Sequence, residues 1–152
     1  MSYEAWMKKY YPISASSFDP NKNTLRNVHS VHDRLEAVEH SIKKWSGLRK
    51  KALMAHGLAL FEGVLTPARE QYLEKGTKLL NIDSGSCALC QLSKTPEGGV
   101  DCARCVFSEV MGADCDFAYS KALYDSNPSL RPMLTALRKV RKSILLKLEN
   151  KE

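Results

Sequence analysis

Between residues 30 and 47 the apolar positions recur at alternating steps of four and three residues. They are Val31, Leu35, Val38, Ile42 and Trp45. This spacing places the side chains in one stripe along an α-helix, and Ser30 is suited to cap its first turn, with Asp33 in a capping-box-like pair. We predict a helix that begins after Ser30, turns the stripe to the core and ends near Gly47. Its predicted outer face comprises His32, Glu36, Glu39, His40 and Lys43.

The last part of the chain carries a longer stripe of the same kind. Ser129 is placed to cap a helix that we expect to run to about Asn150. Its apolar positions are Leu130, Met133, Leu134, Leu137, Val140, Ile144, Leu145 and Leu148. Arg141 falls inside this stripe by helical angle. Its side chain can reach the surface along its aliphatic stem, pair with a buried acid or point into a ligand pocket.

Shorter elements are predicted near the start of the chain. Tyr3, Trp6 and Tyr10 share one helical face, which is typical of a short terminal helix docked on the core. Residues 48–56 continue as a helix that ends at Gly57. The segment 58–65 is too apolar for an exposed loop, so we expect it to lie against the core.

The middle of the chain is predicted to be helical as well. Thr66 followed by Pro67 is typical of a helix start, and this helix would run to about Leu80. Short helices are expected at 103–111, ending at Gly112, and at 116–124. The fold class that follows is mainly α, a helical domain with an inserted Cys-rich metal module.

All five cysteines lie between Cys87 and Cys115. Cys87 and Cys90 form one Cys-x-x-Cys pair, Cys102 and Cys105 form a second after eleven residues, and Cys115 follows nine residues later. Two such pairs are typical of a tetrahedral zinc site. The first choice of ligands is the four paired cysteines, with Cys115 a spare thiol or a replacement ligand.

The predicted metal module spans about 85–116. A strong turn signal at 96–99 lets the two pairs meet. Because the second pair, Cys102 and Cys105, would lie at the N-terminus of a helix over 103–111, the arrangement resembles a treble clef more than a zinc ribbon. An iron–sulfur cluster is the alternative metal group. Disulfides, a redox pair and plain buried thiols are the remaining readings, and an odd cysteine count fits disulfides poorly.

Length and composition are those of an ordinary globular protein with excess positive charge. The 152 residues are expected to form a single domain over 1–152, with a net charge of +6. The start of the chain has no basic region followed by an apolar core, and no apolar run reaches the length of a membrane span, so we expect a cytoplasmic protein without membrane contact. The charge favours acidic partners, namely nucleic acid, a nucleotide or an acidic protein.

Two basic stretches are the candidate contact surfaces, one at 43–51 and one at 131–147. The candidate contact residues are Lys43, Lys44, Trp45, Arg49, Lys50, Lys51, Arg138, Arg141 and Lys142. There is no Gly-rich phosphate loop, Ser-His-Asp motif or His-Glu-x-x-His motif, so catalysis has no positive support and no catalytic residue is nominated. Oligomeric state is left open.

Several fragments together resemble small proteins encoded by tailed bacteriophages and prophages. They are Tyr-Tyr-Pro at 10–12, Lys-Trp-Ser-Gly-Leu-Arg at 44–49, His-Gly-Leu at 56–58, and the cysteine motifs through Cys115. The chain departs from that family at Val106, where a proline is usual. It departs again near Tyr119, where the family has Thr/Ser-Pro-Tyr. The resemblance implies a phage protein acting in the bacterial cytoplasm and implies no reaction.

Two functions follow as hypotheses. The first is a zinc-stabilised basic protein that binds nucleic acid. The alternative is a counter-defence or host-takeover protein that binds and inhibits a host protein or sequesters a nucleotide. An enzyme is the least favoured class, because a closed thiolate site leaves no open position for water.

Overall fold

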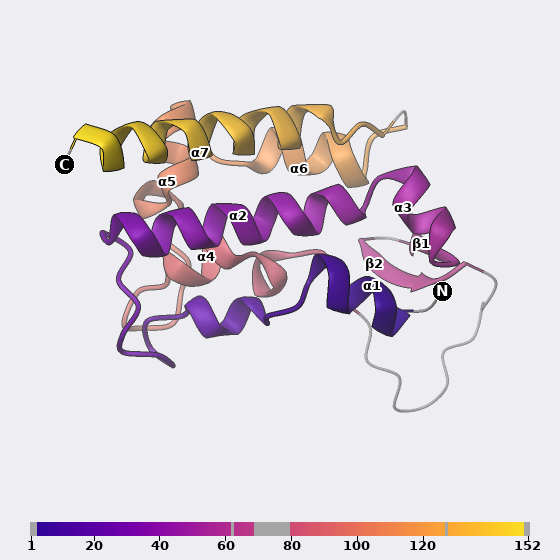
Figure 1. Ribbon diagram of the computed structural model, residues 1–152, viewed down its shortest axis with the longest axis horizontal. Coiled ribbons are helices and arrows are strands. Elements are labelled where there is room, and N and C mark those ends of the chain that lie inside the picture. Colours follow the sequence, from indigo (N-terminus) through magenta and orange to yellow (C-terminus); the bar gives the residue numbers. More distant parts are fainter. Residues whose placement is uncertain (1–2, 62, 69–79, 127, 151–152) are drawn as a thin grey trace.

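The computed structural model describes residues 3–61, 63–68, 80–126 and 128–150 of the chain (Figure 1). In these ranges the structure is mainly helical, with a small antiparallel sheet of strand order β1-β2-β3. This confirms the mainly α class. None of the helices in these ranges has both the length and the apolar character needed to cross a membrane.

Helix α2 (Val31–Gly47) runs through the middle of the molecule (Figure 1). Helix α7 (Arg131–Asn150) packs along one side of it, antiparallel, while α1 (Tyr3–Tyr10) and α4 (Ala88–Leu92) contact the other side. Because α2 has neighbours on both sides, it is buried over more than one stripe. This central position determines the surroundings of every candidate site described below.

The predicted ends of α2 are confirmed. The Ser30 hydroxyl accepts a 3.3 Å hydrogen bond from the Asp33 backbone N–H, and the helix ends at Gly47. Asp33 is not seen to return a hydrogen bond to Ser30; its carboxylate pairs with Arg26 at 2.8 Å instead. The capping box is therefore replaced by an ion pair that holds the preceding loop on the helix.

The docked terminal helix is confirmed by Trp6, whose side chain is fully buried. Its indole N–H donates a 2.7 Å hydrogen bond to the Gly47 carbonyl. The chain then passes through a short 3-10 turn, η1 (Ala15–Phe18), and reaches α2. The first helix is therefore fastened to the far end of α2.

The predicted burial is wrong for two residues. His40 was expected on the outer face of α2 but is only 8% exposed, because the rings of Tyr11 and Phe18 cover it at centroid distances of 4.9 and 5.4 Å. Leu145 was expected in the buried stripe of α7 but is 41% exposed. Leu145 follows the buried Ile144 by about 100° around the helix and so lies at the edge of the buried stripe. The stripe from Met133 to Ile144 is buried as predicted.

After α2 the chain forms α3 (Lys50–Ala55), which ends as predicted before Gly57 at φ +64°. The segment 58–65 lies on the core as expected, but as strands β1 (Leu58–Phe61) and β2 (Val64–Pro67). Pairing between these strands satisfies backbone groups that a buried loop would leave unpaired.

The predicted helix start at Thr66 and Pro67 is wrong, because both residues belong to β2, in which Thr66 pairs with Ala59. Its predicted end at Leu80 is also wrong. Leu80 and Asn81 form β3, which pairs antiparallel with β2. The interior of that predicted helix, residues 69–79, lies outside the described residues.

The cysteine-rich segment folds as a series of short turns and helices. A 3-10 turn η2 (Ser84–Ser86) leads into α4, and a second 3-10 turn η3 (Cys102–Arg104) leads into α5 (Val106–Met111). Helix α6 (Asp116–Leu123) follows. The predicted stop at Gly112 is confirmed by its φ of +76°.

Candidate functional site

The cysteines lie at the starts of the short elements that follow the sheet. Three of them occupy the position that starts a helix, namely Cys87 for α4, Cys105 for α5 and Cys115 for α6. The Cys87 sulfur accepts a hydrogen bond from the Cys90 backbone N–H at 3.4 Å. The turn between the two pairs forms as predicted, with a bridge between Lys94 and Val100.

The five thiols differ in exposure. Cys105 is buried, and Cys87, Cys90 and Cys115 are half-buried. Cys102 is exposed, on the short turn η3. Exposure thus separates Cys102 from the other four, although it shares a Cys-x-x-Cys motif with Cys105.

Electrostatics links the thiols to one another. A hydrogen bond from the Cys90 side chain, followed by the positive charge of Lys44, lowers the pKa of Cys87 below its usual value, while burial raises it in part. The same contact with Cys87 is the largest cause that raises the pKa of Cys90. The pair therefore retains a proton on Cys90 and ionises first at Cys87.

The pKa values of the other two half-buried or buried thiols, Cys105 and Cys115, are raised in turn. Burial and then the charge of Cys87 raise the pKa of Cys105 to about 11 and that of Cys115 to about 12. Cys105 and the exposed Cys102 also raise the pKa of Cys115, so the electrostatic interactions extend over all five thiols. In the described part of the chain, however, no three His, Cys, Asp or Glu side chains are grouped as a ready shell for a metal ion.

Lys44 lies beside these thiols and is only 1% exposed. Its ammonium donates a 2.9 Å hydrogen bond to the Ser86 carbonyl and lies 5.4 Å from the centroid of the Trp45 ring. Burial lowers the pKa of Lys44, while the neighbouring Cys87 and Cys90 and the carboxylate of Asp83 act in the opposite direction.

Lys44 and Trp45 were predicted as contacts for nucleic acid or a partner, and the structure contradicts this. The Trp45 side chain is 3% exposed and its ring meets Tyr119 edge-on. Both residues are covered because α2 is packed on both sides. They are part of the interior and not of a binding surface.

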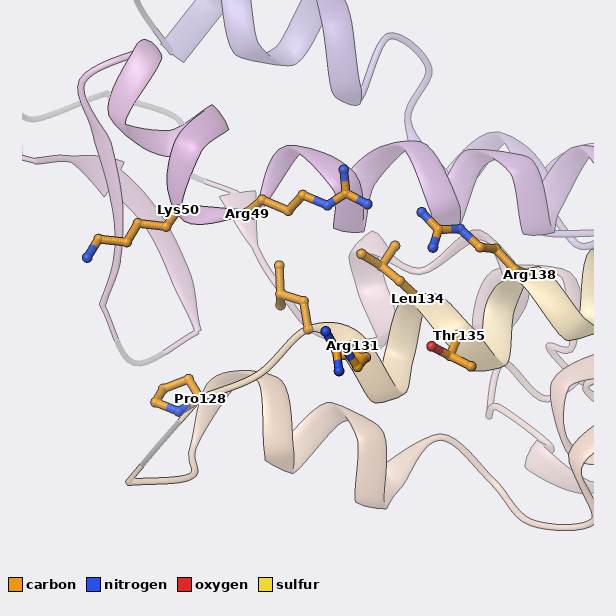
Figure 2. A pocket seen from close by; sticks show the side chains of 8 residues that line it. Arg49, Lys50, Pro128, Arg131, Leu134, Thr135 and Arg138 are labelled. Carbon is orange, nitrogen blue, oxygen red and sulfur yellow. The ribbon is translucent and has the colours of Figure 1, made fainter.

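A basic hollow of about 400 Å³ lies between the α2–α3 junction and the first turns of α7. Its lining residues are Arg49, Lys50, Pro128, Leu130, Arg131, Leu134, Thr135 and Arg138. Figure 2 shows Arg49 and Arg138 extending toward one another from these two elements. The lining contains four cations and no acid.

Within the described part of the chain, the arginines of the basic hollow have no acidic partner. Arg49, Arg131 and Arg138 form no ion pair with a carboxylate among the described residues. Like charges held together without counter-charges produce a strong local positive potential. The hollow can therefore attract a polyanion, and its guanidinium groups can bind phosphate oxygens in pairs.

The structure brings together Arg49, Lys50 and Arg138 from the predicted contact set. Lys43, Lys51 and Lys142 are exposed but do not line the hollow, and Arg141 is half-buried. Arg131 also lines the hollow but was not among the predicted contact residues. The absence of acidic residues from Ser126 to Leu148 was the sequence signal that could have indicated it.

No protein-family model matches the chain, and comparisons with curated proteins and with solved structures give no match either.

Proposed function

We propose that this chain is a zinc-stabilised basic protein that binds nucleic acid through the hollow lined by Arg49, Arg131 and Arg138. The observation that supports the proposal is the meeting of two basic stretches, far apart in the chain, around one concave surface without an acid. A phosphodiester backbone is the polyanion for which paired guanidinium groups are best suited.

The lining favours a nucleic acid over a simple anion because it also has apolar parts. Pro128, Leu130 and Leu134 lie between the cations and offer a surface for a sugar or a base. Lys142 is exposed one helical turn beyond Arg138, on the same face of α7. A strand held in the hollow can therefore continue along α7.

Zinc has a structural part in this proposal. The thiols from Cys87 to Cys115 would hold it, with an iron–sulfur cluster as the alternative. A metal held by thiolates adds folding energy and links α4, α5 and α6. Helix α4 contacts α2, whereas α5 and α6 contact α7. The link would therefore stabilise both helices that form the hollow.

Fluorescence anisotropy with labelled single- and double-stranded oligonucleotides of DNA and RNA, at about 50 mM salt, tests the proposal. The variant Arg131→Gln/Arg138→Gln removes two cations of the hollow. The variant Lys22→Gln/Lys139→Gln removes two exposed cations outside it and is the matched control. We expect at least a tenfold loss of affinity in the first and less than a twofold loss in the second. The proposal fails if the native protein binds no oligonucleotide or if both variants lose affinity equally.

A nucleotide ligand is the second candidate, because the volume of the hollow lies within the range of small-molecule sites. If mononucleotides displace a labelled oligonucleotide at micromolar concentration, sequestration of a nucleotide is the better account. If mononucleotides displace the oligonucleotide only at millimolar concentration, nucleic acid is the better account of the ligand.

The resemblance to phage and prophage proteins supports a role in the bacterial cytoplasm as part of this proposal. Inhibition of an acidic host protein would use the same positive surface. A pull-down from bacterial lysate that recovers one acidic protein, lost in Arg131→Gln/Arg138→Gln, together with no oligonucleotide binding, would favour that alternative.

A further inference from the structure

A second, smaller hollow lies along α6 and has aromatic walls. Its volume is about 200 Å³, and its lining residues are Phe117, Ser120, Lys121, Tyr124 and Asp125. These positions are spaced at three and four residues from their neighbours, so they form one stripe along the helix. We refer to this site as the aromatic hollow.

The two aromatic rings of this hollow are open to solvent. Phe117 is 77% exposed and Tyr124 is 60% exposed. They are seven residues apart, so about 10 Å separates them along the helix axis. Large apolar side chains gathered at one exposed site are typical of an interaction surface. The rings are therefore suited to a ligand that has flat apolar faces.

The remaining residues of the aromatic hollow give it a different character from the basic hollow. Lys121 and Asp125 form an ion pair at 3.2 Å, so their charges offset one another. Ser120 is exposed and carries a hydroxyl that can donate or accept a hydrogen bond. This lining is suited to an uncharged aromatic group such as a nucleobase, whereas the basic hollow is suited to phosphates.

The two hollows are joined through the connection between α6 and α7. The Ser129 backbone N–H donates a 3.0 Å hydrogen bond to the Lys121 carbonyl. Ser129 stands between Pro128 and Leu130, which line the basic hollow, and Lys121 lines the aromatic one. Figure 2 shows Pro128 on this connection, beside the start of α7. A polymer held in the basic hollow can therefore cross the connection and reach α6.

We propose that Phe117 and Tyr124 stack on bases of a single-stranded nucleic acid whose phosphates are bound in the basic hollow. The inference rests on the proposed function and defines its ligand class more narrowly. The bases of a single strand can turn outward and stack on aromatic side chains, and every base has a face for this contact. In a duplex the bases are stacked on one another, so only the basic hollow contributes to binding. Single strands therefore bind more tightly than duplexes, with little dependence on sequence.

Fluorescence anisotropy with one oligonucleotide, as a single strand and as its duplex, tests the inference on the full chain. We expect the native protein to bind the single strand about tenfold more tightly. Phe117→Leu keeps an apolar side chain but removes the ring, so affinity for the single strand should fall about tenfold and affinity for the duplex should not change. Phe117→Trp keeps a ring and should retain both affinities. Leu25→Ala is the control, because it removes an apolar side chain that is 87% exposed and lies outside both hollows.

The Phe117→Trp variant provides a second measurement. Trp6 and Trp45 are buried, so stacking of a base should quench the fluorescence of the added indole and leave that of the native protein nearly unchanged. Absence of this quenching, or equal single-strand affinities of the native protein and Phe117→Leu, would overturn the stacking site. A dimer that is lost in Phe117→Leu, without a change in oligonucleotide affinity, would also overturn it and assign the aromatic hollow to a second copy of the chain.

Failure of this inference is distinguishable from failure of the proposed function. If the native protein binds neither the single strand nor the duplex, both are overturned. If it binds the two equally, and only Arg131→Gln/Arg138→Gln lowers the affinity, nucleic-acid binding in the basic hollow stands and the stacking site is overturned.

Discussion

The indole N–H of Trp6 donates a hydrogen bond to the carbonyl of Gly47, 41 positions later in the chain. This contact fastens the first helix to the end of α2. Arg49 and Lys50, which follow Leu48, form one wall of the basic hollow. Packing at the N-terminal helix therefore positions a wall of the candidate binding surface.

The close packing at Gly47 predicts that Gly47→Ala destabilises the protein. A Cβ atom at this position would overlap with Cγ of the Tyr10 ring, so helix α1 would have to move. Overpacking of this kind typically costs about 1–3 kcal/mol. We expect a decrease of this size in the free energy of unfolding measured in urea. Gly99→Ala is the control, because its Cβ would meet only the Thr95 hydroxyl, at 3.8 Å. An unchanged Gly47→Ala variant would contradict the close contact.

The burial of His40 predicts a pH dependence of stability. Burial is the largest effect on the pKa of His40 and lowers it, and the charges of Lys44 and Lys43 lower it further. The hydrogen bond with Ile13 and the charge of Glu36 act in the opposite direction. Its Nδ1 atom has no hydrogen-bond partner in the described structure, so protonation would create a buried donor without an acceptor. The unfolded chain takes up a proton near pH 6.5, whereas the folded protein does so only at lower pH.

Because the unfolded state binds more protons below pH 6.5, stability must fall as the pH decreases through this range. We expect His40 to contribute a loss of about 1 kcal/mol in unfolding free energy between pH 6.5 and 5.5. The loss should be smaller by this amount in His40→Gln and unchanged in His32→Gln, an exposed histidine of the same helix. Equal pH dependence in both variants would contradict the assignment.

Metal removal is expected to destabilise the whole protein, not the cysteine segment alone. Binding of a structural metal and folding are linked, and α4 packs directly on α2. We expect a chelator to lower the thermal midpoint by at least 10 °C, and added zinc, but not magnesium, to restore it. The same midpoint with and without chelator would remove the structural role of the metal.

Local sequence signals predicted where several helices begin and end better than they predicted how these elements pack. The cap at Ser30 and the stop at Gly112 depend on neighbouring residues, and both are found. The hairpin of β1 and β2 was missed because its apolar residues are compatible with a core-packed segment of any conformation. The pairing is nevertheless local, with Phe61 opposite Val64, and Gly63 in the turn, at φ +78°, was the available sequence signal.

The packing around α2 shows a second limit of prediction from the sequence. One apolar stripe predicted one buried side, so His40 and Lys44 were assigned to the surface. The small residues Ala37 and Ser41 lie on the same second face and allow close packing there. They were the available sequence signal for a helix covered on both sides.

The salt dependence of oligonucleotide binding tests the central claim most directly. If Arg131 and Arg138 each contact a phosphate of duplex DNA, the slope of log affinity against log salt concentration becomes shallower by about 1 for each arginine removed. We predict a change of about 2 in Arg131→Gln/Arg138→Gln and no change in Lys22→Gln/Lys139→Gln. A slope that is identical in the native protein and in the Arg131→Gln/Arg138→Gln variant would contradict nucleic-acid binding in this hollow.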